Sequence, residues 1–266
     1  MCLHFEIQST LTKRYNMKTS HQWIQHFKES AQQQRVDWSL NTDISEQEIS
    51  TIYRSLQAWQ LGETSDGKHL LKAATIYAAQ INDPAYIEAL SLFIKEEQKH
   101  GNNLGTYLDR IGKPRVTSDW GDTLFRKIRY FNTNMEIWTL AVIVVESTAQ
   151  IFYQSLKDAT HCTLLKQICT DILIDEAHHI DFQTERFTII FKSKTGLWKS
   201  ISQRLYYCFF FSTAVVVWMA HRQLFKAGGN TFSRYMLKMK YKYNKIMSRV
   251  TACRIVPHRS TIFQTI

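Results

Sequence analysis

The sequence predicts an all-α protein centred on a four-helix bundle, with additional C-terminal helices. Two segments, residues 97–100 and 176–179, repeat the pattern Glu-x-x-His, which places a carboxylate and an imidazole on one face of a helix. Glu63 lies 34 residues before the first segment, and Glu146 lies 30 residues before the second. Each interval matches one helix and its return, so each pair is expected to face a lone glutamate on the preceding antiparallel helix.

The composition agrees with a helical globular protein. The 266 residues include only three Pro and nine Gly, and 44% of them are hydrophobic, which argues against a disordered chain. A chain of this length can bury a sizeable core as one domain, or as one domain with an extension.

The N-terminal part is predicted to stand apart from the bundle. Residues 1–40 are polar, rich in Gln and irregular in pattern. We therefore expect a loosely packed arm over residues 1–44, anchored by Trp23 and Trp38, and we expect the bundle to follow over residues 45–192.

The first two bundle helices are separated by a turn at Asn82-Asp83-Pro84. The first helix is predicted from a capping Ser45 to about Gln80, with Glu63 on its inner face. In the second helix, Glu97 is the only acid on an apolar stripe. Its neighbour Glu96 is expected to face water or a neighbouring helix.

The third helix is predicted over residues 133–157 and the fourth over residues 162–191. Residues 141–145 are five apolar residues that resemble a strand, but the helical pattern on either side overrides this local preference. Glu146 follows them directly, and a carboxylate in such a position is costly to bury unless a metal or a partner compensates it. This favours a functional role for Glu146.

Six of these positions resemble the metal-binding pattern of the ferritin-like superfamily, which includes bacterioferritin, rubrerythrin and the small subunit of ribonucleotide reductase. The resemblance covers roughly residues 45–192 and rests on the order Glu, Glu-x-x-His, Glu, Glu-x-x-His. It implies a centre of two iron ions, with manganese or a mixed Mn/Fe pair as alternatives, because carboxylates and imidazoles suit these metals. The six expected ligands are Glu63, Glu97, His100, Glu146, Glu176 and His179.

Individual roles follow from the order of the ligands on their helices. Glu97 and Glu176 are expected to bridge the two ions, and each histidine is expected to bind one of them. The resemblance also implies that Asp175 accepts a hydrogen bond from a ligand histidine, although an ordinary solvated aspartate is the alternative. Leu104 stands where ribonucleotide reductase carries its radical tyrosine, so that role is not expected here, and Tyr153 is either a redox tyrosine or part of the core.

The resemblance implies an oxidase or oxygenase that uses O2 or peroxide to oxidise a small organic substrate. A ferroxidase or iron-handling protein is one alternative, and a non-enzymatic, metal-stabilised helical binding protein is another. The chain has no Cys-x-x-Cys, which excludes a complete rubrerythrin. The substrate and the electron donor are left open, as is a homodimer.

A reducing, cytoplasmic location is expected from the cysteines and the N-terminus. The cysteines are odd in number, scattered and predicted to be free thiols, and residues 1–16 carry no apolar run typical of a signal peptide. The five are Cys2, Cys162, Cys169, Cys208 and Cys253.

Residues 193–266 form a basic extension with two predicted helices. An apolar run over residues 205–220 is shorter than the roughly 20 residues of a membrane span, so we expect it to pack on the bundle or on a partner subunit. A basic helix is predicted over residues 231–249. Residues 186–266 hold 15 of the 33 Lys and Arg and none of the 23 Asp and Glu, so the alternative is peripheral contact with an anionic membrane. No nucleic-acid motif supports that class of partner.

Overall fold

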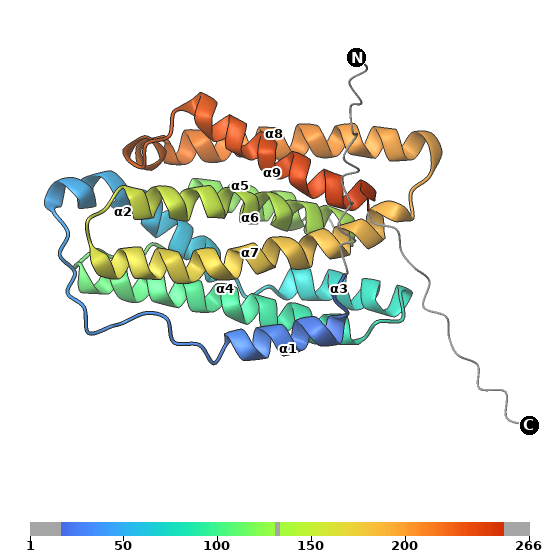
Figure 1. Cartoon of the computed structure of the whole chain (residues 1–266), viewed down its shortest axis with the longest axis horizontal. Helices are drawn as coiled ribbons and strands as arrows, with labels where there is room; N and C mark the ends of the chain where they lie inside the picture. The colour runs from blue at the N-terminus through green and yellow to red at the C-terminus, as the bar shows by residue number, and fades with distance from the viewer. Residues whose placement is uncertain (1–16, 131–133, 253–266) are drawn as a thin grey trace, which may run out of the picture.

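The computed structural model describes residues 17–130 and 134–252, and within these ranges every regular element is a helix (Figure 1). The predicted all-α class is confirmed. The helices are α1 (Ser20–Ser30), α2 (Glu46–Glu63), α3 (Lys68–Gln80), α4 (Ala85–Arg110), α5 (Trp120–Tyr130), α6 (Met135–Asp158), α7 (Thr163–Lys192), α8 (Gly196–Ala227) and α9 (Phe232–Ala252).

The bundle consists of two packed halves. In one half α2 and α3 lie along α4, and in the other half α6 lies along α7. Contacts of α4 with α7 and of α3 with α6 join the two halves. Its interior is filled by fully buried side chains such as Leu56, Leu104, Phe152 and Ile168. Burial of a side chain of this size stabilises the fold by about 1.5–3 kcal/mol relative to exposure.

The single helix predicted from Ser45 to Gln80 is wrong, because the chain breaks between α2 and α3. Helix α2 begins with a capping box in which Ser45 and Glu48 bond each other's backbone N–H groups, and it ends at Glu63. Gly67 has a φ of +63°, and a Cβ there would lie 2.5 Å from Cδ1 of Ile94. The left-handed conformation of Gly67 and the close approach of its backbone to Ile94 interrupt the helical path between α2 and α3. Glu63 occupies the last turn of α2 before this break.

The predicted irregular arm is also wrong for residues 20–30, which form α1. The helix starts with a capping box between Thr19 and Gln22, and Trp23 and Phe27 are buried where α1 packs on α4. Trp38, the other predicted anchor, is 36% exposed, so it does not anchor the segment as the buried Trp23 does. Polar residues on the outer face of α1 conceal its short apolar stripe in the sequence.

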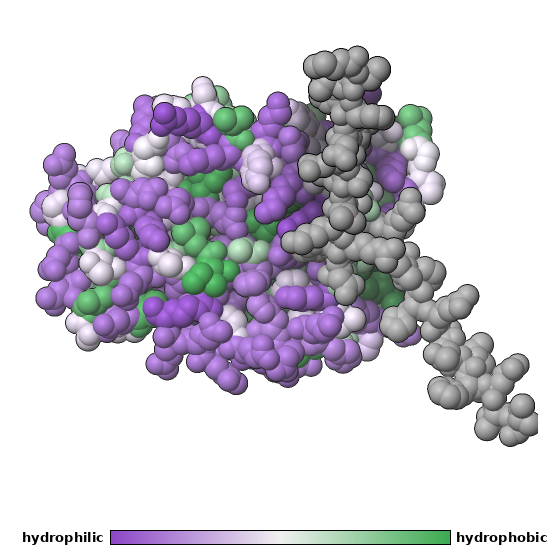
Figure 2. Space-filling view, in the orientation of Figure 1, coloured by the Kyte–Doolittle hydropathy of each residue, from purple (hydrophilic) through white to green (hydrophobic). Residues whose placement is uncertain are grey.

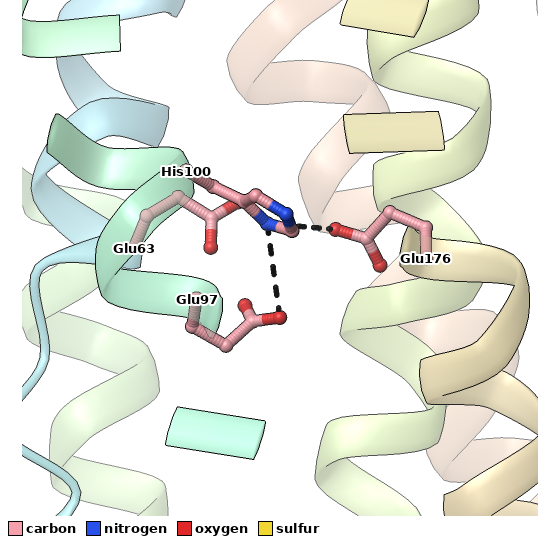
Figure 3. Close-up of side chains that lie close together, drawn as sticks. All are labelled: Glu63, Glu97, His100 and Glu176. Atoms are coloured by element: carbon pink, nitrogen blue, oxygen red, sulfur yellow. Dashed lines mark ion pairs between the residues drawn. The ribbon is translucent and has the colours of Figure 1, made fainter. Parts of the chain in front are cut away.

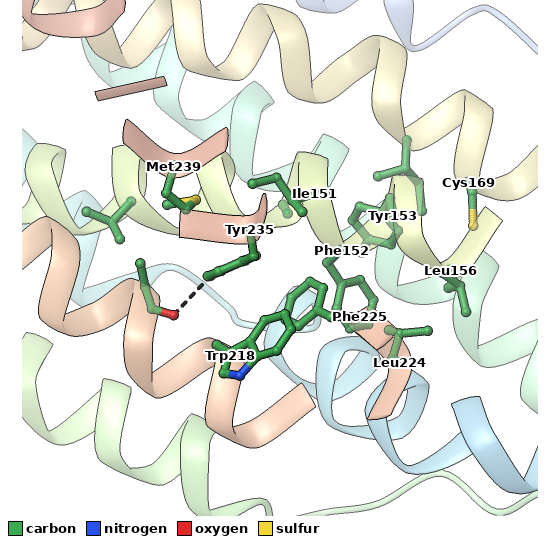
Figure 4. Packing of buried hydrophobic residues seen from close by; sticks show 14 of the residues in the cluster. Ile151, Phe152, Tyr153, Leu156, Cys169, Trp218, Leu224, Phe225, Tyr235 and Met239 are labelled. Atoms are coloured by element: carbon green, nitrogen blue, oxygen red, sulfur yellow. Dashed lines mark hydrogen bonds between the residues drawn. The ribbon is translucent and has the colours of Figure 1, made fainter. Parts of the chain in front are cut away.

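The C-terminal helices cover one side of the bundle. Helix α8 packs along α6 and α2, and α9 packs against α7, α8 and α6, so the predicted packing of the apolar helix on the bundle is confirmed. Figure 4 shows the junction, where Trp218 and Phe225 from α8 lie beside Phe152 of α6 and Tyr235 of α9. Helix α8 is longer than the predicted run and changes direction at His221, whose φ is −119°.

Two helices of the described chain have the length and composition of a membrane span. Of the 18-residue apolar stretch of α6, 72% is buried inside the protein, whereas the buried share of the corresponding stretch of α8 is 28%. Helix α6 is therefore a core helix of the protein. The free thiols of Cys162 and Cys169 are buried and that of Cys208 is exposed, while Cys2 and Cys253 lie outside the described residues.

Candidate metal centre

The structure brings all six predicted ligand side chains together inside the bundle. Glu63 comes from the end of α2, Glu146 from α6, and the two Glu-x-x-His segments from α4 and α7. The side chains of both histidines and of Glu176 are fully buried, while that of Glu97 is 17% exposed. Four separate helices therefore converge on one buried polar cluster.

The cluster consists of two overlapping groups, and within each group the ligand atoms lie within 4.8 Å of one another. The first group, shown in Figure 3, is Glu63, Glu97, His100 and Glu176. The second is Glu97, Glu146, Glu176 and His179. Glu97 and Glu176 belong to both groups, which is the arrangement expected of carboxylates shared by two ions.

Both imidazole rings direct Nδ1 toward the carboxylates. Nδ1 of His179 lies 2.7 Å from Oε1 of Glu97 and 3.6 Å from Oε2 of Glu176. Nδ1 of His100 lies 3.9 Å from Oε1 of both Glu97 and Glu176. The two Nδ1 atoms thus face the same pair of glutamates from two sides.

These inward atoms lack directed hydrogen bonds, and this is what makes the cluster fit metal ions. Among the described residues, the buried atoms without a hydrogen-bond partner include Nδ1 of both histidines and carboxylate oxygens of Glu97, Glu146 and Glu176. Unpaired buried polar atoms are costly. Divalent ions would satisfy all of them at once, and carboxylate oxygens with imidazole nitrogens suit iron and manganese.

Electrostatics within the cluster lead to the same conclusion. Burial, followed by repulsion from Glu97, raises the pKa of Glu63 well above its usual range, and burial and Glu176 do the same for Glu146. For His179, burial alone would lower the pKa, but the charge of Glu97 raises it well above the usual value. Without a cation, the site must therefore hold protons in place of positive charge.

The outer nitrogen of each imidazole is held by a different carboxylate. Nε2 of His100 lies 3.1 Å from Oδ2 of Asp175, and Nε2 of His179 lies 2.8 Å from Oε2 of Glu96. Asp175 therefore occupies the place predicted for it, beside His100. Of the two surroundings expected for Glu96, water or a neighbouring helix, the structure shows the second, because Glu96 contacts residues of α1 and α7 and is 6% exposed. Such outer carboxylates fix the tautomer of a metal-binding histidine, leaving Nδ1 free to bind.

Residues of the N-terminal segment complete this outer layer. Ser30, the last residue of α1, donates a hydrogen bond of 2.6 Å to Glu96. Arg35 donates to Asp171 and Asp175, and Lys99 lies 3.0 Å from Oδ2 of Asp175. Sequence reasoning missed Ser30 and Arg35, because their role depends on α1 and the segment after it covering the face of α4 and α7.

Glu63 has its own supporting contacts. Tyr153 donates a hydrogen bond of 2.6 Å to Oε1 of Glu63, and Nε1 of Trp59 donates to the same oxygen at 2.9 Å. Tyr153 is fully buried, so it is a core residue that also reaches the cluster. Leu104 lies in the apolar core.

A cavity of about 370 Å³ lies beside the cluster, between α2, α3, α4, α5, α6 and α8. Glu63, Glu97 and Glu146 line it where it meets the candidate ligands. Most of the remaining wall is apolar and aromatic, including Trp59, Phe93, Ile94, Trp138, Val142 and Val217. The cavity can therefore hold an organic molecule next to the cluster.

Comparisons with known proteins agree with this fold. No family model and no curated protein matches the chain. Solved structures of R2-like ligand-binding oxidase variants, reconstituted with a Mn/Fe cofactor, do match. One aligns with a TM-score of 0.58 at 15% identity, over 95% of this chain and 99% of the other. A second gives 0.57 at 15% identity, over 94% and 98%.

At this identity, the likeness concerns the fold. A third such structure has a TM-score of 0.56 and covers 89% of this chain, so the shared architecture is not confined to the four bundle helices. The ferritin-like bundle predicted from the sequence is confirmed, and its resemblance to the fold of the R2-like ligand-binding oxidases takes in the added helices as well.

Proposed function

We propose that this chain is an oxidase with a dinuclear metal centre that acts on a small apolar organic molecule. The observation that carries the proposal is the cavity, because its apolar wall ends at three carboxylates of the candidate centre. A metal site used only for stability would not require space for an organic molecule beside it.

The six clustered side chains would hold two ions, either two irons or a Mn/Fe pair such as the structural neighbours carry. Glu63 and His100 would bind one ion, Glu146 and His179 the other, and Glu97 and Glu176 both. Four carboxylates would balance the charge of two divalent ions. When bound and reduced, such a pair supplies the electrons and the binding place for O2 or peroxide.

The residues around the centre would orient the reactants. The aromatic and aliphatic part of the cavity wall would hold the organic molecule against the carboxylates. Tyr153 and Trp59 fix one oxygen of Glu63. Tyr153 keeps a proton at its hydroxyl oxygen, because burial and then the charge of Glu63 raise the pKa of the phenol well above its usual value. That proton lies one hydrogen bond from the cluster.

Reconstitution tests the proposal. Metal-free protein would be loaded with Fe(II), or with Mn(II) and Fe(II), without oxygen, and then exposed to O2. We expect two ions per chain, an absorption change on oxidation, and oxidation of a bound organic molecule detected by mass spectrometry. Glu146→Ala should lower the metal content and the metal-dependent rise in melting temperature, whereas Glu136→Ala, near the start of the same helix, should not.

The outcomes separate this function from its alternatives. Oxidation of many Fe(II) ions per chain, with no organic product, would indicate a ferroxidase. Two bound ions that do not react with O2 would indicate a metal-stabilised binding protein. Equal metal content in Glu146→Ala and the parent would reject Glu146 as a ligand.

A further inference from the structure

Helices α8 and α9 share an outward surface, here called the α8–α9 surface, that is both apolar and basic. They lie side by side along the upper edge of the molecule in Figure 1, and Figure 2 shows hydrophobic side chains reaching that edge of an otherwise largely hydrophilic face. Its most exposed apolar side chains, 62–75% accessible, are Leu197, Trp198, Leu205, Met219, Leu237 and Tyr241.

The outer face of α8 is not the polar face of an ordinary surface helix. Tyr206, Phe210, Ala214 and Trp218 repeat every four residues and are buried against the bundle and α9. A helix with that inner stripe normally carries charged residues on its opposite side. On α8 that side instead presents exposed apolar residues such as Leu205 and Met219, so this face is well suited to an apolar partner.

The same surface carries only positive formal charge. Residues 186–266 contain no Asp or Glu. Some cations of the region turn inward, such as Arg249, which pairs with Asp181, and Lys194, which pairs with Glu136. Other cations are exposed toward the two ends of α8 and along α9, on the same helices as the exposed apolar side chains. They include Lys199, Arg204, Arg222, Arg234, Lys240 and Lys245.

We propose that the α8–α9 surface docks on an anionic lipid bilayer. Lysine and arginine are attracted to the phosphates of lipid headgroups, and leucine, tryptophan and tyrosine enter the headgroup–acyl boundary. A second copy of the chain fits the same surface poorly, since a two-fold interface would bring two cationic faces together. A nucleic acid would match the charge but would leave the exposed leucines in water.

The cavity beside the candidate metal centre adds a consequence that rests on the proposed function. Helix α8 forms part of the cavity wall through Phe209, Ser212 and Val216. A bilayer on the outer face of α8 would therefore lie one helix away from the place where an apolar substrate would bind. Docking itself does not depend on the metals, so the two proposals fail independently.

Flotation of the full-length, metal-loaded protein tests docking. The probes are vesicles of phosphatidylcholine alone and of phosphatidylcholine with phosphatidylglycerol at 3:1. We expect the protein to float with the anionic vesicles at low salt and to remain at the bottom with the neutral ones. High salt should weaken binding, because about 1 M salt shortens the screening length to about 3 Å.

Matched variants locate the contact. The double variant Lys240→Gln/Lys245→Gln should weaken binding by roughly 25-fold, about fivefold for each lysine. The control Lys72→Gln/Lys95→Gln makes the same charge change at exposed positions of α3 and α4 and should bind normally. Trp198→Ser should also weaken binding at both salt concentrations, since its contribution is apolar. All these side chains are exposed, and unchanged circular dichroism and metal content would show that the variants fold.

Three results would overturn the proposal. The first is protein that stays at the bottom with anionic vesicles at low salt. The second is equal loss of binding in the α9 and control double variants, which would mean attraction by net charge alone. The third is a stable dimer in light scattering that Trp198→Ser dissociates, which would assign this surface to a second copy of the chain.

Discussion

Nε2 of His179 lies 2.8 Å from Oε2 of Glu96, while Nδ1 of the same ring lies 2.7 Å from Oε1 of Glu97. Two consecutive residues of α4 thus face opposite edges of one imidazole, and Glu96 holds the outer edge by a hydrogen bond. Ser30 holds the other oxygen of Glu96, so α1 secures the position of the ring through α4. This relationship predicts that Glu96 positions a ligand without touching a metal.

Glu96→Gln should therefore lower the affinity for Fe(II) or Mn(II) by about 10- to 100-fold, the usual effect of losing a carboxylate behind a metal-binding histidine. Competition with a metal chelator would measure the change. Glu88→Gln is the matched control, because Glu88 lies on the same helix with an exposed side chain, and it should bind metal normally. Unchanged affinity in Glu96→Gln would show that the ring needs no such support.

Tyr153→Phe should destabilise the protein and weaken the metal site at Glu63. It removes a 2.6 Å hydrogen bond to a buried carboxylate, and such a loss costs about 1–3 kcal/mol. Denaturant unfolding with and without metal would measure both effects. Tyr86→Phe is the control, since the buried Tyr86 hydroxyl has no hydrogen-bond partner and its removal should cost little. Equal effects of the two variants would contradict a specific role for Tyr153.

Gly101→Ala should displace the end of α2 and, with it, Glu63. A Cβ at Gly101 would lie 2.9 Å from Cγ2 of Thr64 and 3.2 Å from Cβ of Glu63, and overpacking of this kind typically costs about 1–3 kcal/mol. Metal content and unfolding free energy should both fall. Gly62→Ala meets no atom within 4 Å and should instead stabilise α2 by about 0.5–1 kcal/mol. A Gly101→Ala variant with full metal content would show that the helix end adapts.

Glu48→Gln should weaken the start of α2 in a pH-dependent way. Burial would raise the pKa of Glu48, but hydrogen bonds from Ser45 and His161 lower it to about 2. The ordinary value is 4.5, so the carboxylate stabilises the fold fully above that pH and loses its contribution as the pH falls toward 2. Gln can still accept these hydrogen bonds through its amide oxygen, but hydrogen bonds to a neutral group are weaker than those to a charged one, so the variant should lose about 1 kcal/mol at pH 7. Unfolding curves of parent and variant should therefore converge near pH 2.

The fold and the innermost part of the site could be predicted because both follow from spacing along single helices. Glu97 and His100 share a face through helical geometry alone, and Glu63 needs only an antiparallel neighbour to reach them. Glu96 and Arg35 could not be predicted in the same way. Their partners lie 83 and 140 residues away, and only the packing of α1 and the segment after it against α4 and α7 brings them to the site.

The break after Glu63 and the cavity could not be predicted from the sequence either. The apolar pattern continues through Gly67, and the contact with Ile94 that accompanies the break exists only in the packed structure. The cavity is a gap between side chains of six helices, so no local pattern records it. The sequence thus predicted the candidate ligands but not the cavity that could hold a substrate.

Filling that space separates oxidation of an organic molecule from oxidation of iron. Val142 lines the cavity and lies one helical turn before Glu146 on α6. Val142→Phe would place a larger side chain in the cavity without removing any candidate ligand. We expect two metal ions per chain and normal reaction with O2, but at least a tenfold loss in binding or oxidation of the organic molecule, measured by mass spectrometry of the bound fraction.

Val142→Ala enlarges the cavity at the same position and should retain binding, which controls for disturbance of α6. If Val142→Phe binds and oxidises the organic molecule as the parent does, the cavity is not the substrate site, and rapid Fe(II) oxidation in both variants would then favour the ferroxidase alternative.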